Sequence, residues 1–190
     1  MMRYGLIILF IAAGIAATAA GEEVRLRYSS GEYNRTYMWI QYAHPATLFT
    51  PSAEQYPLFL KSAHFGFNAE YYNVRVKVWE ADGATIGSMI GSFWVTTKKW
   101  PEWTDADLSG AGIIIERQDF LISTDDPYRE FFVSFKGSTP ALYPGHHFTS
   151  QDDITWHSAS TDWAIECTVD TGYGIGVAPT SFGRVKALYR

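Results

Sequence analysis

The sequence predicts an all-β protein, an antiparallel β-sandwich of jelly-roll type with about ten short strands. Apolar and polar residues alternate with period two in several segments, as they do on a strand with one buried face. Turn-forming dipeptides separate these segments at short intervals. Beyond the N-terminal segment, no window carries the apolar i, i+3, i+4, i+7 stripe of an amphipathic helix.

Residues 1–20 have the pattern of a secretory signal peptide. Arg3 precedes the apolar run Leu6–Ile15, and the small residues at 17–20 match what a signal peptidase recognises. The apolar segment Gly5–Ala20 contains 16 residues, fewer than the ~20 that span a bilayer as a helix. We therefore expect a secreted or cell-surface protein with no membrane span after signal cleavage, and a retained anchor is the alternative.

Residues 21–170 are predicted to form the sandwich domain. Val74, Val76 and Val78 alternate with Arg75 and Lys77, which places the valines in the core and the two cations in solvent. The segment 162–169 alternates in the same way, with Glu166 and Thr168 outward. The other expected strands are Val24–Tyr28, Tyr37–Tyr42, Leu58–Phe67, Phe93–Thr97, Ile113–Glu116, Phe120–Ser123 and Phe131–Lys136. The turn signals between strands are Asp82-Gly83, Ser109-Gly110, Asp126-Pro127 and Pro144-Gly145.

Residues 171–190 differ from the domain in composition. The first part is a Gly-rich linker, and residues 181–190 form a short cationic tail. A disordered end, a docking segment and an export tag are the interpretations that this composition allows. The folded domain is expected to end near Asp170.

Composition excludes several classes of protein. Aromatic residues make up 16% of the 190 residues, too many for a disordered chain. The net charge is −5 without any basic cluster, so nucleic acid is not an expected partner. Cys167 is the only cysteine, which excludes an intrachain disulfide. Because Cys167 alternates with Trp163, Ile165 and Val169, we expect a buried thiol without a catalytic role.

Two acidic pairs are the candidate metal ligands, Asp125-Asp126 and Asp152-Asp153. Calcium prefers carboxylate and carbonyl oxygens from loops such as those at the ends of a β-sandwich, but Asp is also a common turn residue. A structural calcium ion is therefore a candidate, and no cofactor is required. His146 and His147 point to opposite faces of an extended chain, which favours a solvated loop over a zinc site.

The aromatic residues are the main functional lead. Trp100 and Trp103 flank a Pro-Glu pair in a polar segment where burying both rings is difficult, and exposed rings stack on sugars or contact proteins. The tryptophans assigned to the core are Trp39, Trp79, Trp94 and Trp163. The predicted ligand-binding residues are Trp100, Trp103, Tyr71, Tyr72 and Trp156.

Several segments together resemble a β-sandwich accessory module of exported bacterial multidomain proteins. Residues 74–83, VRVKVWEADG, are similar to its V-x-V-W-x-x-D-G hairpin, and residues 162–165, DWAI, to its closing D-W-M-I strand. Residues 42–51 and 56–60 resemble the opening segments of the module, and they occur in the same order. The module's D-L-S and D-F-x-V segments have counterparts at 107–109 and 119–122. Glu166 and Cys167 depart from the family pattern, which has a basic and a small residue there. The resemblance spans about residues 28–170 and implies a binding or structural accessory without catalytic residues.

The function expected from these observations is that of a secreted, non-catalytic module that binds a glycan or an extracellular protein. No nucleophile elbow, phosphate loop or nucleotide fingerprint is present in the sequence. Two alternatives remain open. One is a small jelly-roll carbohydrate-active enzyme, and the other is a self-assembling subunit of an extracellular layer or filament.

Overall fold

A computed structural model describes residues 21–38, 44–70, 74–125 and 134–171. The predicted signal peptide, Tyr71, Tyr72, Asp126 and the C-terminal tail lie outside the described residues. Within the described ranges the chain forms strands and two short 3-10 turns, Ala53–Gln55 and Ser109–Ala111, and no α-helix. No helix in these ranges is long and apolar enough to cross a membrane.

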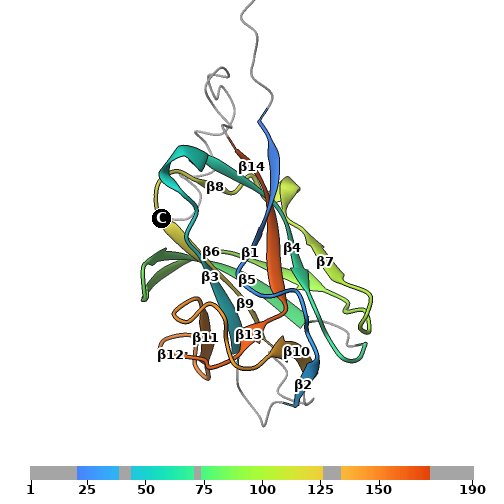
Figure 1. The fold of residues 1–190 in the computed structure, drawn as a ribbon. Helices are drawn as coiled ribbons and strands as arrows, with labels where there is room; N and C mark the ends of the chain where they lie inside the picture. The colour runs from blue at the N-terminus through green and yellow to red at the C-terminus, as the bar shows by residue number, and fades with distance from the viewer. Residues whose placement is uncertain (1–20, 39–43, 71–73, 126–133, 172–190) are drawn as a thin grey trace, which may run out of the picture.

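Three antiparallel sheets make up the fold (Figure 1). The first sheet has the order β1 (Glu23–Arg27), β14 (Ile165–Thr171), β4 (Leu58–Phe65) and β7 (Thr104–Asp107), and β8 (Ile114–Ile115) also pairs with β4. The second has the order β13 (Asp162–Trp163), β10 (Ser134–Ser138) and β2 (Arg35–Met38). The third has the order β12 (Trp156–Ser158), β11 (His147–Ser150), β3 (His44–Phe49), β9 (Asp119–Asp125), β5 (Val74–Asp82) and β6 (Thr85–Val95).

The all-β, antiparallel prediction is confirmed, and the strand count is corrected. The described residues form 14 strands rather than about ten. The expected strand Ile113–Glu116 is present as the short strand β8, and the expected strand at 162–169 is divided into β13 and β14. The strands that the sequence did not predict are β3, β7, β11 and β12.

The segment expected to form one closing strand divides between two sheets. Trp163 pairs with Gly137 in the second sheet, whereas Ile165 pairs with Phe65 in the first. Ala164 lies at the change of sheet, where its N–H donates to the carbonyl of Lys136 and its carbonyl accepts from the N–H of Gly66. The backbones approach closely here, because a Cβ added to Gly66 would lie 2.7 Å from the Ala164 Cβ.

The main core is shared by all three sheets. Phe65 and Cys167 come from the first sheet, Phe135 from the second, and Val76 and Phe120 from the third, and all are buried. The predicted burial of Cys167 is confirmed, and burial raises the pKa of its thiol well above the usual value.

A second, smaller apolar cluster lies on the opposite face of the third sheet. It consists of Ala46, Leu48, Trp79, Ala81, Leu121 and Phe148. Consecutive residues of β9, such as Phe120 and Leu121, are therefore both buried, on opposite faces. The third sheet thus has two buried faces, and a polar group on either face can lose its contact with water.

Two outward assignments and one core assignment from the sequence are corrected. Lys77 is 1% exposed and Glu166 is 3% exposed, although both were expected in solvent. Trp94, assigned to the core, is 54% exposed because it lies on the edge strand β6. Trp79 and Trp163 are buried as predicted, and Trp39 lies outside the described residues.

Candidate functional site

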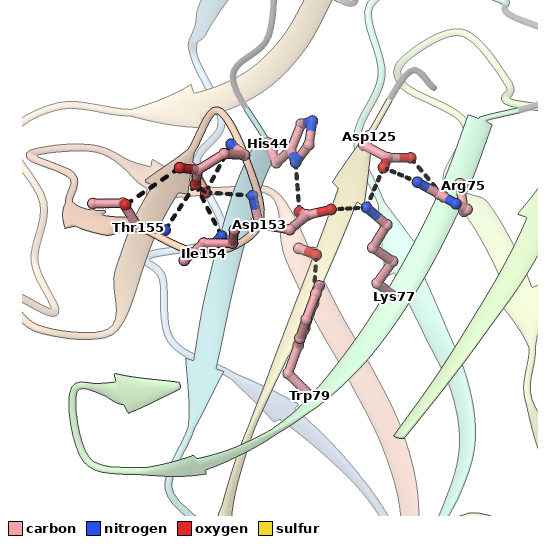
Figure 2. Close-up of polar contacts among 11 residues, drawn as sticks. His44, Arg75, Lys77, Trp79, Asp125, Asp153, Ile154 and Thr155 are labelled. Carbon is pink, nitrogen blue, oxygen red and sulfur yellow. Dashed lines mark hydrogen bonds and ion pairs between the residues drawn. The ribbon is translucent and has the colours of Figure 1, made fainter. Parts of the chain in front are cut away.

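Two of the candidate metal ligands, Asp125 and Asp153, meet at the buried side chain of Lys77 (Figure 2). Asp125 is the last residue of β9, and Asp153 lies in the turn between β11 and β12. Lys77 is on β5, where the register places Arg75 opposite Asp125 and Lys77 opposite Ser123. The Nζ atom of Lys77 contacts a carboxylate oxygen of each aspartate. We call His44, Arg75, Lys77, Asp125 and Asp153 the charged cluster.

Each carboxylate of the charged cluster has a second partner. The Asp125 carboxylate accepts from the Arg75 guanidinium, at 2.8 Å from Nη2 and 3.2 Å from Nε. This hydrogen bonding raises the pKa of Arg75. The Oδ1 atom of Asp153 lies 2.6 Å from Nδ1 of His44. Burial opposes ionisation of Asp153, but hydrogen bonds from His44 and Lys77 outweigh burial and lower its pKa.

The ligand atoms of His44, Asp125 and Asp153 lie within 4.8 Å of one another, close enough to surround one metal ion. One imidazole with two carboxylates suits a transition metal better than calcium, which takes six to eight oxygens. However, the ammonium group of Lys77 contacts both carboxylates. Lys77 and Arg75 balance the two negative charges, so a metal ion would have to displace Lys77. Calcium binding at Asp125 and Asp153 stays a prediction.

The carboxylate of Asp152 stabilises the turn in which Asp152 lies. Its carboxylate accepts from the N–H groups of Ile154 and Thr155, at 2.9 and 2.7 Å. These backbone hydrogen bonds, led by that of Thr155, lower the pKa of Asp152 to about 2. The next residue, Asp153, has a positive φ of 61°, and Ser150 Oγ accepts its N–H. Asp152 and Ser150 therefore hold the turn that presents Asp153 to Lys77.

The predicted ligand-binding tryptophans are partly buried. The rings of Trp100 and Trp103 meet edge-on at 5.4 Å, and each also contacts Tyr33. Both pack against the main core. Trp156 packs against the smaller cluster, 5.8 Å from Trp79. The structure thus brings Trp100 and Trp103 together in the segment before β7 and places Trp156 apart from them, on β12 of the third sheet. Their binding role stays a prediction.

Sequence reasoning missed His44 and Lys77 as members of a site. The charge of Lys77 between two valines was the only local signal, and it indicated a solvent-facing position. The second apolar cluster explains the error, because it gives the third sheet two buried faces. His44 precedes a proline at the start of β3, and nothing in that pattern points to Asp153, which is far along the chain.

Comparisons with known proteins add a fold likeness. No protein-family model matches the sequence, and no curated protein matches it significantly. The structure is similar to the clostridial cysteine protease Cwp84 after propeptide cleavage, with a TM-score of 0.53 and 11% identity over 78% of this chain and 40% of that chain. A second structure contains the cysteine protease and lectin-like domains of Cwp84, a surface layer associated protein of Clostridium difficile. It aligns with a TM-score of 0.43 and 11% identity over 72% and 36% of the chains.

At 11% identity the likeness shows the fold alone, and the chain spans about 40% of the length of the first of these structures. The described residues are all-β, and their fold is similar to that of a part of Cwp84. The resemblance inferred from the sequence is thus supported only as a likeness of fold.

Proposed function

We propose that this protein is a secreted, non-catalytic β-sandwich module that acts at the cell surface by binding a glycan or a protein. The observation that carries the proposal is the fold shared with a part of Cwp84. Cwp84 is described as a surface layer associated protein with a lectin-like domain. We infer that the shared part is the lectin-like domain, since the described residues of this chain are all-β. The signal-peptide pattern of residues 1–20 supports export.

The charged cluster supports a scaffold role in this proposal. Its two carboxylates are engaged by two cations, and Lys77 is almost inaccessible to solvent. Groups that are neutralised and buried in this way hold strands and turns in place, whereas a catalytic acid or base must reach a substrate. The cluster ties the turn between β11 and β12 to β5, and so stiffens the third sheet.

The candidate contact surface is the aromatic pair Trp100 and Trp103. Both side chains keep part of their surface in solvent, and Pro101 and Glu102 between them are exposed. Arg25 lies over the ring of Trp103, 5.2 Å from its centre. A partly exposed indole held by neighbouring rings is a rigid platform, and rigidity lowers the entropy cost of binding.

The test is binding of the mature chain, residues 21–190, to insoluble cellulose, chitin, β-1,3-glucan and peptidoglycan. We expect at least one to retain the protein, and Trp103→Ala to lower the bound fraction several-fold. Trp94→Ala on the third sheet is the matched control, because it removes an exposed indole elsewhere. Thermal melting of each variant separates lost binding from unfolding. Retention by none of the four solids would count against the glycan form of the proposal.

One observation favours the alternative of an assembling subunit. β6 lies at the edge of the third sheet, and none of its eleven residues is charged. Uncharged edge strands invite pairing with another chain. Concentration-dependent polymers that disappear in Ser88→Lys would favour this alternative. Turnover of a polysaccharide that is lost when a carboxylate is changed would favour the enzyme.

A further inference from the structure

Five polar side chains form one patch on the outer face of the first sheet, away from the charged cluster. They are Ser62 and His64 on β4, Asp105 and Asp107 on β7, and Thr168 on β14. The register places His64 opposite Asp105, and Ser62 opposite both Asp107 and Thr168. Residues paired in this way share a face of the sheet, so their side chains are neighbours. We call this group the polar row.

His64 is the centre of the polar row. Its Nδ1 atom lies 2.6 Å from Oδ1 of Asp105. Its Nε2 atom lies 2.8 Å from Oγ1 of Thr168 and 3.1 Å from Oγ of Ser62. Because an ionised carboxylate only accepts, Nδ1 donates to Asp105, and in that tautomer Nε2 accepts a hydroxyl proton. The His64 side chain is 12% exposed and that of Asp105 is 57% exposed, so a fixed imidazole is joined to a carboxylate that reaches solvent.

The order carboxylate, imidazole, hydroxyl also occurs in the triads of hydrolases, but the surroundings here do not suit acyl transfer. A triad works with N–H donors that stabilise an oxyanion above the sheet. β4 lies between β14 and β7, and the N–H groups of a strand paired on both sides point along the plane of the sheet. The polar row therefore offers donors and acceptors for binding, without an oxyanion hole among the described strands.

The polar row continues into the aromatic surface on the same face. Glu166 is the cross-strand neighbour of His64. Its carboxylate accepts from Tyr33 Oη at 2.9 Å and from Nε of Arg25, and Arg25 lies over the ring of Trp103. Indole, guanidinium and polar row thus follow one another across the first sheet. A sugar ring needs an apolar platform for its C–H face and hydrogen-bonding groups for its hydroxyls, and this face supplies both.

We propose that the outer face of the first sheet is a subsite for a neutral sugar. Trp103 provides the platform, and Asp105, Ser62 and Thr168 exchange hydrogen bonds with the sugar hydroxyls. The hydroxyl groups both donate and accept, and the carboxylates accept, which matches the mixed donors and acceptors of a polyol. The carboxylates of Asp105 and Asp107 disfavour an acidic sugar by charge repulsion. This inference rests on the proposed function, since it gives the glycan form of that function a place and a ligand class.

The test is isothermal titration of the mature chain with three soluble probes: cellohexaose, chitohexaose and the anionic hexagalacturonate. We expect one of the neutral probes to bind more tightly than hexagalacturonate. Ser62→Ala and Thr168→Val each lower its affinity about five- to tenfold, the loss expected for one hydrogen bond. Asp105→Asn preserves the shape of the side chain and lowers affinity less. His157→Ala and Ser88→Ala, at exposed positions of the third sheet, are the matched controls and leave affinity unchanged.

The possible outcomes distinguish a failure of the proposed subsite from a failure of the proposed function. Loss of affinity in the row variants, with controls and melting temperatures unchanged, supports both. A neutral probe that binds the row variants normally but binds Trp103→Ala weakly keeps the proposed function and overturns the subsite. Tighter binding of hexagalacturonate also overturns the subsite. If no neutral probe binds, the subsite is wrong, and the four insoluble solids then decide the glycan form of the proposed function.

Discussion

At the scale of single residues, the charge of Lys77 is stabilised by neighbouring carboxylates rather than by water. Its ammonium group is almost fully buried and touches Asp125 and Asp153, which have Arg75 and His44 as their further partners. Taking charges out of water is costly, so such a group persists only when its partners compensate it. Without Lys77, the cluster would keep the two carboxylates, with Arg75 beside Asp125 only and His44 beside Asp153.

Replacing Lys77 is therefore expected to destabilise the protein strongly. Lys77→Met keeps the length of the side chain and removes the charge, and we expect a loss of about 3–5 kcal/mol in the free energy of unfolding. Urea denaturation of both proteins measures this difference. The control is Lys61→Met. The Lys61 side chain is 34% exposed and pairs with Asp170 at 3.4 Å, so this change should cost below about 1 kcal/mol. Equal, small losses in both variants would show that the charged cluster contributes little.

At the scale of elements, His147 joins strands that are distant in the sequence. It starts β11, where a solvated loop was expected, and its side chain is 1% exposed. Its Nε2 atom donates to the carbonyl of Tyr28 at 2.6 Å, and Nδ1 accepts from the N–H of Trp163 at 3.2 Å and lies 3.2 Å from Thr47 Oγ1. One neutral imidazole thus connects β11 with β3, with β13 and with the segment after β1.

This arrangement predicts a pH dependence of stability. Burial lowers the pKa of His147, outweighing the opposing effects of the Tyr28 carbonyl and the Asp162 carboxylate. The unfolded chain therefore binds a proton at a pH where the folded protein does not. The contribution of neutral His147 to stability is fully present above the unfolded pKa of about 6.5. It is lost as the pH falls below that value toward the folded pKa.

Melting temperatures between pH 8 and pH 5 measure this contribution. The wild type should lose stability over the interval, and His147→Gln should start from a lower value and lose less. His157→Gln, which changes an exposed histidine on β12, should keep the wild-type slope. An unchanged slope in His147→Gln would assign the pH dependence to other groups.

At the scale of the whole molecule, β1 forms one edge of the first sheet. β1 pairs with β14 from Glu23 to Arg27, and Leu26 packs into the main core. Removing residues 1–20 leaves this pairing intact, whereas removing residues 1–27 exposes the edge of β14 and deletes a core side chain. The loss of a buried leucine alone costs about 2–5 kcal/mol.

Two truncations test this role of β1. The chain starting at residue 21 should be soluble and melt in a single transition. The chain starting at residue 28 should melt at least about 5 °C lower or fail to fold, given 2–4 °C per kcal/mol for a domain of this size. Circular dichroism follows both transitions. Similar melting temperatures would mean that β1 is dispensable for the fold.

The sequence by itself determined the all-β class, the antiparallel arrangement, and the burial of Trp79, Trp163 and Cys167. These properties follow from period-two alternation and turn residues, which act over a few neighbouring positions. Only the tertiary structure decided that Lys77 and Glu166 are buried and that the chain changes sheets at Ala164. It also decided that Asp125 meets Asp153 and that His64 meets Asp105. These contacts depend on which strands pair and in which register, a choice made by long-range packing that local sequence patterns do not encode.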